Sequence, residues 1–277
     1  MTRGPMTRGP MTRGPMTRGF ALLIVLWTMV LLALLVSQIS AAGRSEAELA
    51  TNLRGSAVAE AAADGAEATA LFRYLDPSAL HWPADGAWHR LVIGDAEVAV
   101  ALADEDGRVN PNSAPMALLT ALLRRIGVDP GAAAGIAAAM VDWRSPRPAA
   151  LPLGARLSQY RAAGMAWGPP GEPFQSVGEI SLVRGMTPAI LAALRPHVSV
   201  FTADEVDPAL ADPVVRAALA DANGGIVPPS SGTSGARTLE VTARAIASGA
   251  RYTGTSVVRV DPTNGTILTL AWGQGNG

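Results

Sequence analysis

The chain has 277 residues, of which 49% are hydrophobic and 16% charged, and its formal net charge is −1. This size and composition accommodate a membrane segment plus one or two folded domains, and the charge gives no drive toward nucleic acid. Cysteine is absent and all 22 basic residues are arginine, which excludes disulfides, thiolate nucleophiles, Schiff-base lysines and the phosphate-loop lysine. The three histidines, at positions 81, 89 and 197, are too far apart in sequence to suggest a metal motif.

Residues 1–19 form a basic leader that opens with three copies of the repeat Met-Thr-Arg-Gly-Pro. Such a short repeat cannot form a packed unit, and a proline in every copy prevents a continuous helix. An extended basic leader is one interpretation. We favour a repeat expansion or a start codon assigned too early, and leave these residues out of the fold argument.

The segment 20–42 contains 23 residues without a charge, and its first 17 are almost all apolar. About 20 such residues cross a bilayer as a helix, so this segment is predicted to span a membrane. Arginines precede it, which predicts a cytoplasmic N-terminus and an exported remainder. A signal peptide cut after Ala42 and an uncleaved signal anchor are the alternatives.

The helical pattern continues from residue 44 to residue 75, with Leu49, Leu53 and Ala57 on one spacing, and Asp76-Pro77 ends it. A hairpin is then predicted over residues 88–103, turning at Gly94-Asp95. Three further strands are predicted at 238–248, 252–260 and 266–273, with a turn at 261–265. Together these segments predict a small antiparallel sheet.

Between the strands the pattern is helical. Helices are predicted at 116–126, after Asn112-Ser113 and Pro115, and from Asp129-Pro130 to residue 143. An irregular, proline-containing stretch is predicted from 144 to 173, followed by a short helix with a Ser176/Glu179 capping box. Further helices are predicted from Thr187-Pro188 and at about 208–222, before a mobile loop at 224–236.

Several segments resemble one known family. They are RGFALLIVLW (18–27), DEDGRVNPNSA (104–114), MVDWR (140–144) and PFQSVGEISLVRGMTPAILAALRPHVSVF (173–201). They resemble the minor pseudopilin K of type II secretion systems, within the type IV pilin-like class. The resemblance implies an α+β fold in which a long transmembrane and amphipathic helix packs on a small sheet. It also implies an inserted all-α domain, of the SAM-like or helix-hairpin-helix-like kind.

On this resemblance the chain divides into five parts. They are the leader 1–19, the transmembrane helix 20–42, the helix continuation and first strands 43–103, the helical insertion 104–200, and the rest of the sheet domain 201–277. The implied role is that of a non-enzymatic subunit at the tip of the pseudopilus, which initiates its assembly and supports export across the outer membrane. The alternative is a periplasmic binding or adaptor protein tethered by an uncleaved signal anchor.

The resemblance also implies processing, partners and a location. A prepilin peptidase would cut between Gly19 and Phe20, and Phe20 would be N-methylated. The expected partners are the I and J minor pseudopilins and the pseudopilus. The expected location is the bacterial inner membrane, crossed once, with a periplasmic C-terminal domain.

The fifth residue after this cut is Ile24, where pilin-like subunits usually carry a glutamate that pairs with a neighbour's N-terminal amine. A subunit without that carboxylate cannot make this contact. The tip position, with no subunit above it, fits such a sequence, although signal anchors also have apolar residues there.

Three weaker patterns in the sequence have a structural explanation beside the functional one. Val183-Arg184-Gly185-Met186 resembles a helix-hairpin-helix turn, but the exported part has 18 basic and 23 acidic residues, so we expect no nucleic acid. Asp104 and Asp106 are weak candidates for calcium ligands, because the loop has carboxylates at short spacing without the full EF-hand pattern; the family resemblance adds to the case for calcium. No hydrolase motif is present, and Ser230–Gly235 is a linker.

Overall fold

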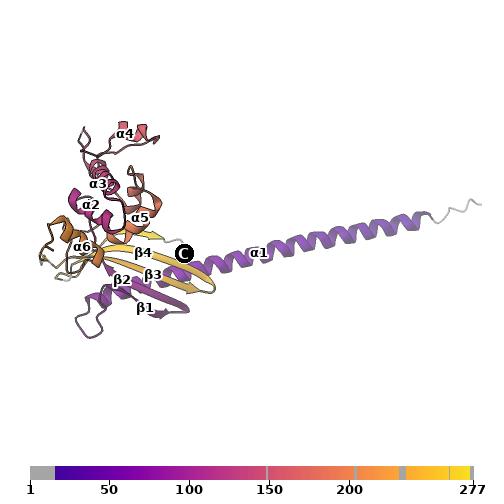
Figure 1. Ribbon diagram of the computed structural model, residues 1–277. Coiled ribbons are helices and arrows are strands. Elements are labelled where there is room, and N and C mark those ends of the chain that lie inside the picture. The colour runs from indigo at the N-terminus through magenta and orange to yellow at the C-terminus, as the bar shows by residue number, and fades with distance from the viewer. Residues whose placement is uncertain (1–15, 148, 203–204, 231–234, 262, 275–277) are drawn as a thin grey trace, which may run out of the picture. The chain divides into compact units, whose positions relative to one another are not determined.

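The computed structural model describes every position except 1–15, 148, 203–204, 231–234, 262 and 275–277 (Figure 1). The repeat of the leader and part of the predicted loop 224–236 therefore lie outside the described residues. The chain forms two units, Met1–Gly55 and Ser56–Gly277, and each is described by itself.

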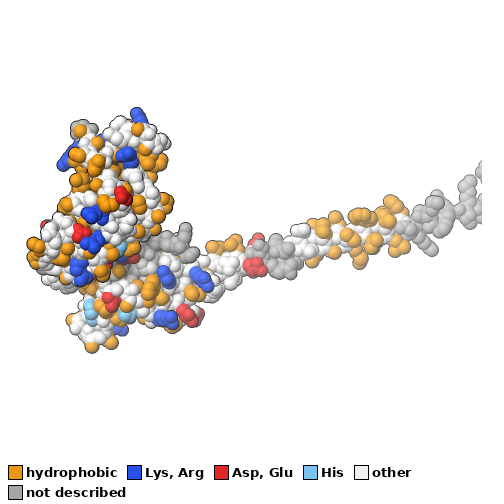
Figure 2. All heavy atoms as spheres, viewed as in Figure 1, with side chains coloured by type: hydrophobic (Ala, Val, Ile, Leu, Met, Phe, Trp, Pro, Cys, Tyr) orange, Lys and Arg blue, Asp and Glu red, His pale blue; other side chains and the backbone are white. Residues whose placement is uncertain are grey.

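In the first unit the described backbone is a single helix, the start of α1, whose bounds are Met16–Leu75. Apart from Thr28 and Ala33, its side chains between Leu22 and Val36 are large, apolar and exposed, and Figure 2 shows this run of exposed hydrophobic side chains. The side chains of residues 21 and 39–42, within the predicted membrane span, lie outside the described residues. Over the part of the chain that is described, no helix is long and apolar enough to cross a membrane.

The second unit contains a five-stranded antiparallel sheet in the order β1-β2-β3-β4-β5. Its strands are β1 (Asp85–Ile93), β2 (Ala96–Asp104), β3 (Arg237–Ala247), β4 (Ala250–Asp261) and β5 (Thr266–Gln274). The predicted strands and the Gly94-Asp95 hairpin are confirmed. Gly94 has a φ of 57°, the left-handed conformation that tight hairpin turns require.

One face of the sheet packs on the C-terminal part of α1. The helix presents a row of buried alanines, and β2 and β3 present alternate apolar residues to them; the row consists of Ala59, Ala62, Ala63, Ala66 and Ala70. Because alanine has the smallest apolar side chain, the helix lies close to the strands. The helix-on-sheet part of the predicted fold is thus present.

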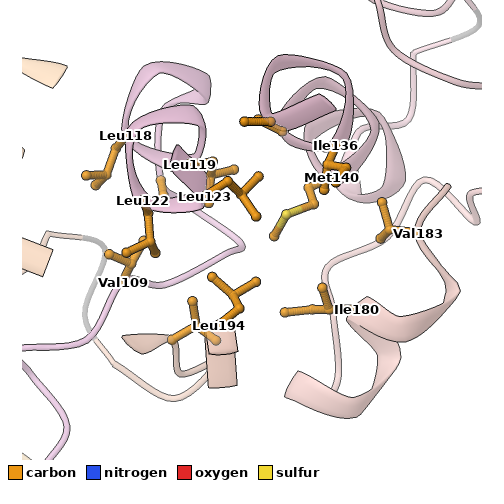
Figure 3. Close-up of a cluster of buried hydrophobic side chains, with 14 of the residues drawn as sticks. Val109, Leu118, Leu119, Leu122, Leu123, Ile136, Met140, Ile180, Val183 and Leu194 are labelled. Atoms are coloured by element: carbon orange, nitrogen blue, oxygen red, sulfur yellow. The ribbon is translucent and has the colours of Figure 1, made fainter. Parts of the chain in front are cut away.

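The helices are inserted between β2 and β3, which are neighbours in the sheet. They are α2 (Met116–Arg125), α3 (Pro130–Arg144), α4 (Leu157–Ala162), α5 (Pro188–Leu194) and α6 (Pro213–Ala222), with 3-10 helices η1 (Val177–Leu182) and η2 (Arg195–His197). In their core, Leu119 and Leu123 of α2 point toward Met140 of α3 (Figure 3).

The insertion differs from the prediction in three places. It extends beyond residue 200, because Val215, Ala218 and Leu219 of α6 belong to the same core as α2. The stretch 144–173 contains the short helix α4, which the prediction treated as irregular; the buried ring of Tyr160 anchors it to the core. The helix predicted after Ser176 is a 3-10 helix rather than an α-helix.

Candidate functional site

The junction between the sheet and the helical insertion contains Asp104 and Asp106, the two candidate calcium ligands. The chain leaves the sheet at Asp104, at the end of β2, and returns to it at Arg237, at the start of β3. Since β2 and β3 are paired, with Asp104 opposite Leu239, both crossings lie at the same end of the sheet. The acidic loop and the strand end therefore share one small region.

Arg108 ties the two sides of this junction together. Its guanidinium lies 2.5 Å from a carboxylate oxygen of Glu105 and 2.8 Å from one of Glu240, on β3. Glu105 is only 2% exposed and also accepts a hydrogen bond from the hydroxyl of Ser199. Burial raises the pKa of Glu105 to about 7, while Arg108 and Ser199 oppose this rise and Glu240 adds to it.

Asp104 and Asp106, the candidate calcium ligands, lie beside Arg237. Asp104 accepts a hydrogen bond from the amide of Asp106 at 2.9 Å. Arg237 lies 3.9 Å from Asp106 and 3.4 Å from Asp207. Burial raises the pKa of Asp104 to about 6, and the neighbouring carboxylate of Asp106 adds to this effect, although the hydrogen bond from the Asp106 amide opposes it.

Among the described residues, no three His, Asp or Glu side chains are grouped so that they could hold a metal ion. The guanidinium of Arg237 faces Asp106. The three histidines are also apart: His81 contacts Tyr74, His89 stacks on Trp82, and His197 pairs with Asp212.

The segments that carry the family resemblance meet inside the insertion. The side-chain amide of Asn112 both accepts from the backbone N–H of Phe174, at 2.7 Å, and donates to its carbonyl, at 3.0 Å. Arg144 donates to the carbonyls of Pro111 and Ala114. The rings of Trp143 and Phe174 are parallel, with their centroids 6.0 Å apart. Residues 104–114, 140–144 and 173–201 therefore form one packed structure.

Glu179 takes part in this structure in an unexpected way. Ser176 caps η1 as predicted, since its hydroxyl accepts from the Glu179 amide. The Glu179 carboxylate, however, accepts from the indole N–H of Trp143 and from the amide of Gln175, both at 2.8 Å. The second half of the predicted capping box is thus replaced by a tertiary contact.

Asp142 is the carboxylate of the motif MVDWR (140–144). It is fully buried, accepts from the amides of Leu151 and Ala155, and lies 3.5 Å from Arg156. A Cβ at Gly154 would collide with its carboxylate, so glycine is required there. The available signal was a carboxylate within an alanine-rich apolar helix, which is costly unless its hydrogen bonds are satisfied.

The helix-hairpin-helix-like turn has a structural explanation. Gly185 has a φ of 88°, which favours glycine, and the side chain of Ile136 lies 3.0 Å from where a Cβ would be. The amide of Arg184 donates to the phenol oxygen of Tyr160 at 2.9 Å. This backbone amide is therefore engaged within the protein.

The predicted processing site lies in α1. The Gly19–Phe20 bond is part of this helix, and the side chains of Phe20 and Ile24 are exposed.

Residues 99–203 match the model of the family described as type II secretion system (T2SS), protein K. This range runs from β2 through the three motif segments that meet in the insertion. The chain therefore carries a protein K domain, and the resemblance inferred from the sequence motifs is confirmed.

Two relatives extend this comparison. The type II secretion system protein K of Klebsiella pneumoniae is 30% identical over 140 residues, which cover 46% of this chain and 42% of that protein. The match thus spans less than half of the relative's length. A chain in the crystal structure of the GspK-GspI-GspJ complex from enterotoxigenic Escherichia coli has a TM-score of 0.62 at 17% identity, covering 85% of this chain and 99% of that one. This likeness shows a shared α+β fold.

Proposed function

We propose that this chain is a minor pseudopilin of a type II secretion system, a non-enzymatic subunit at the tip of the pseudopilus. One observation carries the proposal: a protein K domain is inserted between two neighbouring strands of a helix-on-sheet body. The body supplies a helix suited to packing beside other subunits, and the insertion adds bulk at the end of the sheet where both crossings lie. In this role the chain initiates assembly and supports protein export across the outer membrane.

We further propose that the chain is processed before it assembles. A prepilin peptidase cuts between Gly19 and Phe20, and Phe20 is then N-methylated. The segment 20–42 crosses the inner membrane, with the rest of the chain in the periplasm, and leaves the membrane as the filament grows. The long uncharged run after four arginines supports this proposal.

Mass spectrometry and N-terminal sequencing of the mature protein test this function. A chain that begins at a methylated Phe20 is the expected result. An intact leader favours the alternative, a periplasmic binding or adaptor protein on an uncleaved signal anchor. A chain that begins at Gly43 indicates a cleaved signal peptide and also contradicts the pseudopilin proposal.

The proposed partners are the I and J minor pseudopilins of the same system. The solved relative comes from a complex that is named for GspK, GspI and GspJ. The proposed contact is the part of α1 that carries Leu49, Leu53 and Ala57, because these side chains are exposed.

A further inference from the structure

The two edges of the sheet differ in chemistry. In the described part of the chain the sheet ends at β1 on one side and at β5 on the other. The strand β1, DGAWHRLVI, carries Asp85 and Arg90. The strand β5, TILTLAWGQ, carries no charge, and its large side chains Ile267, Leu268 and Trp272 are 44%, 57% and 55% exposed.

An edge strand presents unpaired backbone N–H and C=O groups that another strand can pair with. Natural proteins commonly protect such edges with charged side chains, prolines or bulges. The ladder between β4 and β5 has one bulge, since Val258 pairs with Thr269 whereas Val257 pairs with Ala271. Before this bulge, residues 266–269 pair regularly with β4 and carry no charge. Neither a bulge nor a charged side chain therefore protects this segment from pairing with another strand.

Two of the exposed side chains of β5, Ile267 and Trp272, lie on the face of the sheet that α1 covers. Ile267 is opposite Val260, which is buried in the core that the helix covers. Trp272 is opposite Ser256, whose hydroxyl donates to Glu67 of α1 at 2.8 Å. The apolar edge is thus continuous with the side of the sheet on which α1 lies.

We propose that residues 266–269 of β5 pair with an extended strand of a partner subunit, which joins the sheet as a sixth strand. The inference rests on the proposed function, which places other pseudopilins beside α1. The chemistry of β5 defines the occupant: a short strand that is uncharged opposite residues 266–269, since β5 offers no counter-charge there. The main-chain hydrogen bonds supply affinity, and the apolar side chains supply specificity.

The direction of α1 argues against a second copy of the chain as the occupant. Antiparallel pairing of β5 with β5 relates the two copies by a two-fold axis. Residues 56–75 of α1 in the two copies would then run in opposite directions. Subunits whose N-terminal helices enter one membrane from the same side have helices that run in the same direction, so a strand from a different subunit fits better.

Backbone hydrogen exchange tests the proposal. The full-length chain in detergent micelles is compared with the same chain after mixing with the purified I and J minor pseudopilins of its system. We expect the amides of residues 266–269 that point away from β4 to exchange at least about tenfold more slowly in the complex, while β1 is unchanged.

Each outcome decides a different point. If the complex forms and β5 exchanges as before, the β5 proposal is wrong and the proposed function stands. If no complex forms, both are overturned. If β5 becomes protected in the chain alone as its concentration rises, a second copy is the occupant and the assignment to a partner subunit fails.

A matched pair of substitutions separates the edges. Leu268→Lys places a charge on β5, and Val92→Lys places one on β1, where the valine is 76% exposed. We expect Leu268→Lys to weaken the complex about tenfold, because it removes an apolar contact and requires a charge to be desolvated, and Val92→Lys to leave it unchanged. Slow exchange in β3 in both variants checks that the sheet is intact, and equal affinities of the two variants would overturn the proposal.

Discussion

Ile24 is the residue at which the sequence departs most clearly from the usual pilin-like pattern. In the proposed tip role no subunit lies above it, so Ile24→Glu places a carboxylate in the apolar helix without a partner amine. A charge at the centre of a membrane helix costs about 2.5–3.5 kcal/mol on insertion scales, and less near the interface. We expect impaired membrane retention or assembly initiation, measured as secretion and as complex formation in cells.

The folded domain provides the control for this substitution. Because residue 24 lies in the first unit, the Ser56–Gly277 unit should keep its fold, which proteolysis can check. Normal secretion, with variant subunits found along the shaft of the filament, would contradict the tip argument.

Glu67 is a carboxylate on the face of α1 that packs on the sheet. Burial raises its pKa above the ordinary value of 4.5, although the hydrogen bond from Ser256 opposes this rise. Because the folded state holds the proton more tightly, ionisation costs stability as the pH rises through 4.5 and the raised pKa, and the cost is complete above both.

We therefore expect Glu67→Gln to raise the free energy of unfolding at neutral pH by up to about 1 kcal/mol, a gain limited by partial exposure. Below pH 4 the difference from the wild type should vanish. Urea unfolding of the full-length chain in detergent, from pH 4 to pH 8, measures it. Ser256→Ala is the companion variant, because it removes the hydrogen bond that Glu67 accepts. A Glu67→Gln chain that is less stable than the wild type at neutral pH would refute this account.

The part of α1 that carries Leu49, Leu53 and Ala57 is the surface that we expect to contact other subunits. Leu53 is 63% exposed, and Ala57, one turn further along, is also exposed. Because an apolar contact is lost and a charge must be desolvated, Leu53→Asp should weaken binding of the I and J subunits by at least about tenfold. Co-purification from detergent measures this loss.

Ala68→Asp gives a matched control for Leu53→Asp. It places the same charge on an exposed position of α1, where no large apolar side chain is removed. Equal binding by both variants and the wild type would count against a subunit contact through Leu53.

The elements of the fold differed in how far the sequence could predict them. The five strands were predictable because alternating apolar residues and turn residues such as Gly94 act over short distances. The place of α6 was not, because its pattern is that of any amphipathic helix and only its contact with α2 assigns it to the insertion. The 3-10 form of η1 was also missed, and so was the hydrogen bond from Trp143 to Glu179, which are 36 positions apart.

The candidate site followed the same rule. A local pattern placed Asp104 and Asp106 in one loop, but it did not give the residues that they contact. Arg108 and Glu240 are 132 positions apart, and Glu67 and Ser256 are 189 apart. Such pairs depend on strand order and on helix docking, which no local pattern encodes. The apolar edge of β5 also became visible only when the sheet order showed that it is an edge.

Arg108 joins the loop that enters the insertion to β3 of the sheet, through Glu105 and Glu240. Its removal in Arg108→Ala leaves the carboxylates of Glu105 and Glu240 facing each other without a cation. Loss of one partner from a fully buried pair costs about 3–5 kcal/mol; we expect about 2–3 kcal/mol here, since Arg108 and Glu240 are partly exposed. Urea unfolding followed by tryptophan fluorescence measures the loss.

The result expected for the whole molecule is a loss of cooperativity. Trp143 lies in the insertion and Trp88 in the sheet. In a variant that keeps one of these two tryptophans and has phenylalanine at every other tryptophan position, the fluorescence reports on one of the two parts. In Arg108→Ala the insertion and the sheet should unfold at different urea concentrations, whereas the wild type unfolds in one step. Arg125→Ala removes an exposed pair with Asp221 inside the insertion and should leave the transitions coincident. Coincident transitions in Arg108→Ala as well would show that the apolar contacts, and not this ion pair, hold the two parts together.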